Sequence, residues 1–200
     1  MKRSRGAGRG GGEVVNRASL FYVMNPDFSK NHFELFGITR TFAIDVAALD
    51  IAYREVQREV HPDRFAAATD AEKRLAAQWA TQANGAYRTL KSPLNRGRYL
   101  LQLSGIDTEE ERNTAMPLEF LVQQMEWREA VVDAKVKKDD VKLDQLASIK
   151  RREEKLLFTE LAEQLSLPAT IADARETVRK LRFLEKLGEE IDIAAEEIES

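Results

Sequence analysis

The sequence predicts an all-α protein with two helical parts, and three observations lead to this prediction. Leu, Ala, Glu and Arg are abundant, while Gly and Pro together account for only 15 of 200 residues, a composition that favours helices. From residue 45 onward, apolar residues recur at intervals of three and four, which is the period of an amphipathic helix. A polar, acidic stretch at residues 106–115 interrupts this pattern. We therefore expect a helical hairpin followed by a three-helix bundle.

Residues 1–30 are predicted to form a disordered basic tail, because glycines and arginines alternate through its first 12 positions and such a composition cannot build a core. Met24 is an alternative initiator. A targeting peptide or an RNA-binding arm is the competing interpretation of this segment.

Residues 31–105 are predicted to form the first domain. A short helix over residues 32–37 is closed by Gly37, and Asp45 is a suitable N-cap for the next helix. Pro62 disfavours helical geometry at His61 and should end that helix. The apolar positions of this helix are Leu49, Tyr53, Val56 and Val60.

Thr69 and Glu72 form a possible capping box that opens the second helix of the hairpin. Its apolar stripe comprises Leu75, Trp79, Ala83, Ala86 and Leu90. Two such helices joined by a short loop should pair antiparallel. Pro93 follows, and residues 94–103 predict a further short helix that stops near Gly105.

Residues 116–200, beyond a linker at 106–115, are predicted to form the three-helix bundle. The expected helices run from about Pro117 to Lys137, from Val141 to Leu165, and from Ala169 to near the C-terminus. Short connections between them imply an up-down-up arrangement.

Composition excludes several classes of function. The chain has no cysteine and two histidines, so thiol chemistry is absent and a catalytic metal site is not expected. No sequence follows the phosphate-binding loop pattern, and no apolar run is long enough to span a membrane. Net charge is +4 over residues 1–32 and −9 over residues 106–200, too little positive charge to favour nucleic acid. We expect a non-enzymatic protein of the cytoplasm, less so of the mitochondrial matrix, without cofactors.

The strongest local motif is His61-Pro62-Asp63, at the predicted turn of the hairpin. Arg54 and Arg58 lie one turn apart on the preceding helix, and Arg64 follows the motif. By itself the tripeptide is compatible with a simple helix stop, and the arginines with a solvated face.

In context, these residues resemble the J-domain of co-chaperones, and Tyr53 and residues 84–90 (Asn-Gly-Ala-Tyr-Arg-Thr-Leu) fit that pattern. The sequence is also similar to the HscB-type J-proteins of iron–sulfur cluster assembly. The matching residues are Pro93-Leu94, Arg96, Tyr99-Leu100-Leu101 and, in the acidic part, residues 177–187. The resemblance covers about residues 32–187. It implies that His61, Pro62, Asp63, Arg54, Arg58 and Arg64 dock on an HscA/DnaK-type chaperone and stimulate its ATPase. It also implies that the bundle holds the scaffold protein IscU.

The first bundle helix has two apolar sides. On a helical wheel, Phe120 and Trp127 fall on one side and Met125 on the other, and Phe183 lies off the core stripe of the last helix. Two apolar sides indicate either full burial or a partner. The predicted scaffold-binding set is Leu121, Val122, Met125, Glu126, Glu129, Asp133 and Phe183. The competing interpretation is that these residues pack internally or against the J-domain.

Two other functions stay open at this point. The first is a J-domain co-chaperone that serves another client. The second is a helical adaptor in which His-Pro-Asp occurs by chance; an enzyme is the weakest alternative.

Overall fold

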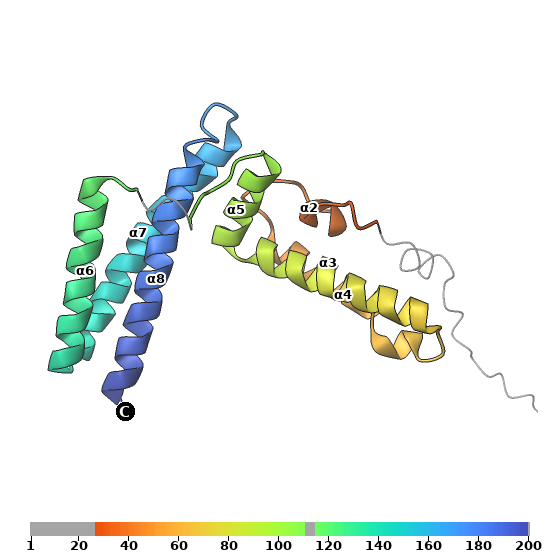
Figure 1. The fold of residues 1–200 in the computed structure, drawn as a ribbon, viewed down its shortest axis with the longest axis horizontal. Coiled ribbons are helices and arrows are strands. Elements are labelled where there is room, and N and C mark those ends of the chain that lie inside the picture. The colour runs from red at the N-terminus through yellow and green to blue at the C-terminus, as the bar shows by residue number, and fades with distance from the viewer. Residues whose placement is uncertain (1–26, 111–114, 200) are drawn as a thin grey trace, which may run out of the picture.

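The computed structural model describes residues 27–110 and 115–199, and within these ranges all regular structure is helical, which confirms the predicted fold class. Figure 1 shows a helical hairpin on one side, a three-helix bundle on the other and one short helix between them. No helix in the described ranges is long and apolar enough to cross a bilayer. The part of the predicted tail that precedes residue 27 lies outside the described residues.

The hairpin follows from its capping residues. After the short helix α2 (His32–Leu35), α3 (Val46–Glu59) begins where the Asp45 carboxylate accepts the N–H groups of Ala47 and Ala48. A single 3₁₀ turn, η1 (Pro62–Phe65), connects α3 to α4 (Asp70–Lys91). The Thr69–Glu72 capping box is formed at the start of α4 as predicted.

Two apolar clusters hold the hairpin together. Near α2, the fully buried Leu49 of α3 packs with Ala86 and Leu90 of α4, where alanine lets the two helices approach closely. The predicted inward positions are therefore largely correct. A second cluster at the far end comprises Val60, Phe65, Ala76 and Trp79.

Helix α5 (Pro93–Leu103) leaves α4 through Ser92, which ends one helix and caps the next. Leu100 on α5 packs into the hairpin core. Leu94 and Leu101 instead pack against the bundle. One short helix therefore contributes to two cores.

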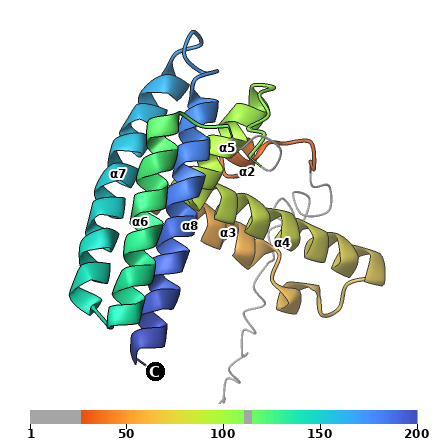
Figure 2. The same ribbon diagram turned by 60° about the vertical axis from the view of Figure 1, so that its left-hand side comes forward.

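The bundle comprises α6 (Leu118–Lys137), α7 (Asp140–Ser166) and α8 (Ala174–Glu199). A tight turn separates α6 from α7, where Lys138 adopts a left-handed conformation (φ 53°) and Asp139 caps the next helix. Helices α6 and α8 run in the same direction and α7 runs against them (Figure 2). Side chains from all three helices form the core, namely Val131, Ala134, Leu143, Leu146, Leu184, Leu187, Ile191 and Ala194.

Two predicted helix starts need correction. The last helix begins at Ala174 rather than near Ala169, because residues 167–173 form successive turns. There the Thr170 hydroxyl donates to the carbonyls of Gln164 and Leu167, and the Asp173 N–H donates to the Thr170 carbonyl. Pro117 stands at the N-cap of α6 instead of its first helical position.

The hairpin and the bundle meet through a shared apolar cluster. Fully buried Leu161 of α7 and Val178 of α8 close on α5. Gly97 on α5 lies so near that an added Cβ would come within 2.9 Å of a Leu161 methyl group. Arg98 on α5 binds Glu110 through two nitrogens, which ties the predicted linker to this junction. The exact domain limits stay predictions.

Candidate functional site

The His61 turn is exposed although its base is buried. Pro62 follows His61, whose backbone is extended (φ −61°, ψ 133°), so α3 ends there. Phe65 closes η1 and packs against Val60 and Trp79. His61, Pro62, Asp63 and Arg64 all remain exposed. The buried Phe65 ring therefore holds the turn in place, while the four predicted site residues of the turn face solvent.

His61 and Asp63 interact with each other but remain accessible. The His61 Nδ1 atom accepts the Asp63 backbone N–H at 3.3 Å and lies 3.5 Å from its carboxylate. The His61 side chain is 58% exposed and that of Asp63 is 90% exposed. Such an open pair lacks the water exclusion and the phosphate and Mg²⁺ ligands that phosphoryl transfer requires. Both side chains are accessible to a second molecule.

The face of α3 beside the turn carries the other predicted residues. Arg54 and Arg58 are both exposed, because Leu49, Val56 and Val60 take the inward positions. Ile51 shares their face at helical spacing and is 52% exposed. Sequence reasoning missed Ile51. Its three- and seven-residue spacing to the arginines was the signal that could have found it.

Polar contacts between α3 and α4 hold this face in place. The Tyr53 hydroxyl donates to Asn84, and the Tyr53 and Tyr87 rings stack at 4.0 Å. The Tyr87 hydroxyl donates to Asp50, which also pairs with Lys91. The Tyr87 hydrogen bond and the Lys91 cation lower the pKa of Asp50. These contacts brace the half of the hairpin that lies nearer α2.

A second candidate surface runs along α6. Val122 and Met125 are 45% and 62% exposed, as expected for predicted contact residues. Glu126, Glu129 and Asp133 are exposed beside them, and Asp133 pairs with Lys137 at 3.1 Å. The apolar stripe continues in both directions through exposed Leu118, Val132 and Val136. Val136 was missed, although it lies seven residues beyond Glu129.

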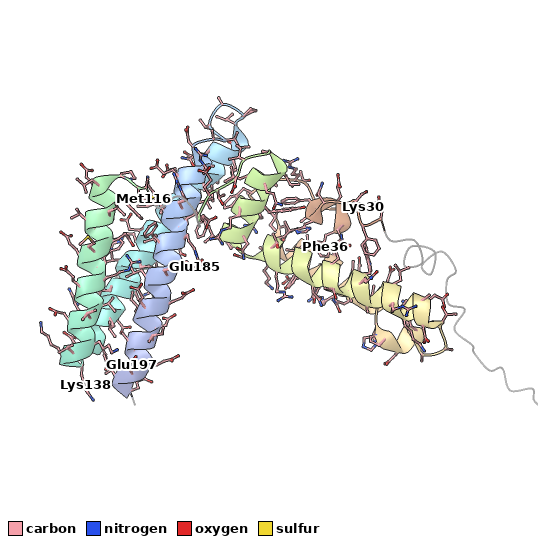
Figure 3. The ribbon with its side chains drawn as sticks, in the orientation of Figure 1. Lys30, Phe36, Met116, Lys138, Glu185 and Glu197 are labelled. Atoms are coloured by element: carbon pink, nitrogen blue, oxygen red, sulfur yellow. The ribbon has the colours of Figure 1, made fainter. Side chains whose placement is uncertain are left out.

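Leu121 and Phe183, two further residues of the predicted scaffold-binding set, lie near the seam between α6 and α8. Ion pairs define how the two helices align along this seam. Arg128 pairs with Glu190 at 3.0 Å, and Lys135 pairs with Glu197. Figure 3 shows Lys138 and Glu197 at the same end of the bundle, as parallel helices require. One heptad before these pairs, the same register brings Leu121 of α6 toward Phe183 of α8.

Neither Leu121 nor Phe183 is fully exposed. Both are half-buried, and the Phe183 ring packs edge-to-face on Phe120 with centroids 5.7 Å apart. Val122, Met125, Glu126, Glu129 and Asp133 are therefore exposed together on α6, whereas Phe183 packs on Phe120, which the helical wheel places on the side of α6 opposite Met125. Only part of that set stands free in solvent.

Behind this surface lies a buried amide. Gln124 on α6 is 1% exposed, and neither its oxygen nor its nitrogen has a hydrogen-bond partner. Burying an unpaired amide costs free energy. No group of three His, Cys, Asp or Glu residues able to hold a metal occurs in the described ranges.

Comparison with known proteins gives consistent relatives. A family model described as the HSCB C-terminal oligomerisation domain matches residues 116–192. The co-chaperone protein HscB homolog of Paraburkholderia phymatum is 52% identical over 170 residues, covering 85% of this chain and 97% of that protein. Its counterpart in Chromobacterium violaceum is 53% identical over 175 residues, covering 88% and 99%.

Two solved structures are similar as well. The chaperone HscB from Vibrio cholerae matches with a TM-score of 0.75 and 33% identity, covering 84% of this chain and 99% of that chain. The human co-chaperone protein HscB matches with a TM-score of 0.79 and 31% identity, covering 84% and 83%.

Proposed function

This chain belongs to the HscB family of co-chaperones, and from that premise we propose that it links two partners in iron–sulfur cluster assembly. One partner is an HscA-type ATPase of the DnaK class, contacted through the His61 turn and the Arg54–Arg58 face. The other is an IscU-type scaffold protein, held on the α6 surface. The ATP chemistry belongs entirely to the ATPase.

The observation that carries this proposal is that the His61 turn is exposed to solvent but anchored by a buried side chain. Phe65 anchors the turn, while His61 and Asp63 point their polar groups into solvent. A rigid, exposed polar turn binds a partner with little loss of conformational entropy. Arg54, Arg58 and Arg64 add positive charge beside it, and such charge steers an acidic partner into the correct orientation.

Stimulation of an ATPase by this surface is an effect on conformational equilibrium. A bound protein shifts a two-state partner only by binding one state more tightly than the other. His61 and Asp63 therefore act by contacting the ATPase when it is in its hydrolysis-competent state. They supply no group to the phosphate itself.

The α6 surface supports the second half of the proposal. Met125 and Val122 offer apolar contact, and a flexible methionine adapts well to a partner surface. Glu126 and Glu129 border them. Such a surface fits a scaffold with an apolar patch that is flanked by basic side chains.

A three-component assay tests the proposal. The ATPase rate of an HscA-type chaperone is measured alone, with this protein, with an IscU-type scaffold, and with both. We expect stimulation by this protein alone and a larger stimulation when the scaffold is added. Stimulation without any scaffold effect or scaffold binding would point to another client. An unchanged ATPase rate in every mixture would contradict the co-chaperone role and favour a helical adaptor.

A further inference from the structure

A third surface lies between the hairpin and the bundle, and neither partner above uses it. It is a groove of about 640 Å³. One wall is the segment before α3, the second is α5 and the third is α7. The lining side chains that matter here are Phe42, Ile44, Arg96, Arg151, Lys155 and Phe158.

Arg96 is a buried cation that forms no ion pair with any carboxylate of the described residues 27–110 and 115–199. It is only 6% exposed, and one of its terminal nitrogens donates to the Leu90 carbonyl at the end of α4. Its guanidinium lies over the Phe42 ring at 5.1 Å, and its Nε has no acceptor. Burial lowers the pKa of Arg96, and no neighbouring carboxylate opposes that shift. Buried charges in proteins are normally paired, so this groove holds an uncompensated positive charge.

Helix α7 adds further positive charge to the groove. Arg151 and Lys155 are four residues apart and therefore share one face of the helix. Glu154 also lines the groove, but its carboxylate is already bound to Lys150 at 2.9 Å. These cations belong to a region with net charge −9. Their clustering is therefore not a by-product of a basic domain.

The groove is also apolar. The Phe42 and Phe158 rings stack with centroids 6.4 Å apart and an interplanar angle of 29°. A simple inorganic anion would satisfy the cations and leave these rings without contact. A small organic ligand is normally enclosed on most of its surface, whereas this groove is open to solvent and bordered by three separate segments. An extended chain segment fits such a shape better.

From this combination we propose that the groove binds an acidic peptide segment of a partner protein, one that carries an aromatic or aliphatic side chain next to its carboxylates. The carboxylates pair with Arg96, Arg151 and Lys155. The apolar side chain packs on Phe42 and Phe158. The site includes no residue of the His61 turn or the α6 surface, so it does not depend on the function proposed above.

Fluorescence anisotropy with the full-length chain tests this proposal. The probe is a labelled peptide of sequence Gly-Asp-Phe-Asp-Asp-Phe-Gly. One comparison peptide replaces Asp by Asn, and the other replaces Phe by Ala. We expect the probe to bind at low salt and each comparison peptide to bind about tenfold more weakly, which corresponds to about 1.4 kcal/mol.

Variants on α7 locate the binding. Arg151→Ala combined with Lys155→Ala should weaken probe binding by about tenfold or more. Arg152→Ala is the matched control, since Arg152 is exposed on the same helix but does not line the groove, and it should bind normally. The variants avoid Arg96, whose bond to Leu90 supports the end of α4.

Several outcomes would overturn the proposal. They are no binding of the probe, equal binding of the Asn peptide, or equal loss in the Arg152→Ala control. Displacement of the probe by ATP at lower concentration than by unlabelled peptide would show that the groove is a nucleotide site instead.

Discussion

At the His61 turn, four consecutive side chains stand in solvent and only Phe65 reaches the core. On α6, Val122 and Met125 are exposed, whereas Leu121 and Phe183, the latter on α8, are half-buried. The turn therefore separates contact residues from packing residues. The α6 surface shares some side chains between the two tasks. Substitutions at the turn should therefore change partner binding without changing stability, whereas substitutions on the α6 surface should change both.

The largest expected effect is at the turn. His61→Gln should reduce stimulation of an HscA-type ATPase to background, because the imidazole is exposed and is the group that we propose contacts the ATPase. Its free energy of unfolding should stay within about 0.5 kcal/mol of wild type, as for other surface changes. Lys73→Gln, an exposed change near the same end of the hairpin, is the control and should stimulate normally. Normal stimulation by His61→Gln would show that the turn is not part of the interface. Loss of the helical circular-dichroism signal would show that His61 has a structural role.

The second prediction concerns the mixed surface. Leu121→Ala, Met125→Ala and Phe183→Ala together should abolish scaffold binding. Met125→Ala alone should weaken binding about tenfold with little change in stability. Phe183→Ala should also destabilise the bundle by about 1–3 kcal/mol, because its ring packs on Phe120. Calorimetric titration and urea unfolding separate the two effects. Leu156→Ala, exposed on α7, is the control, and an equal loss of binding there would show that the surface has been misplaced.

The third prediction tests the packing behind α6. Gln124→Leu should raise the free energy of unfolding by about 1–2 kcal/mol, because it removes a buried amide without partners. Urea unfolding measures the change, and scaffold binding should be unaffected. A destabilised variant would reveal that the amide is satisfied in the folded protein.

The smallest effect is expected from the arginine face. Each of Arg54→Ala and Arg58→Ala should weaken chaperone docking by less than about 1 kcal/mol, since both are exposed. Wild-type docking should weaken as salt rises, because exposed charges are screened within about 8–10 Å at 0.1–0.15 M. Binding measured over a salt series checks this. An affinity that does not change with salt would show that the arginines do not act through charge.

Local features of the fold were predictable because their causes are local. The capping box at Thr69, the cap at Asp45 and the stop at Pro62 each depend on neighbouring residues, and all three are confirmed. The start of the last helix was misplaced by five residues. There the Thr170 hydroxyl and backbone form turns that compete with helix, a feature that apolar spacing does not report.

Long-range features of the candidate sites could not be predicted in the same way. The wheel identified two apolar sides of α6, but not that Phe183 would pack on Phe120. Nor did spacing indicate that Arg96 would be buried over Phe42, since the two are 54 positions apart. The first contact depends on how α6 packs against α8, and the second on how α5 packs against the segment before α3. They are set by packing between elements rather than by any one segment.

Helix α5 contributes to both cores, and Gly97 lets it lie directly against Leu161. The two proposed binding surfaces are therefore joined through packed helices, not through a flexible tether alone. For a tethered pair, the local concentration of one bound partner near the other depends on linker length. Here that local concentration is set by the fixed distance and angle between the hairpin and the bundle. A client on α6 would thus be presented to the ATPase at one distance and in one orientation, and lengthening residues 106–115 should leave that presentation unchanged.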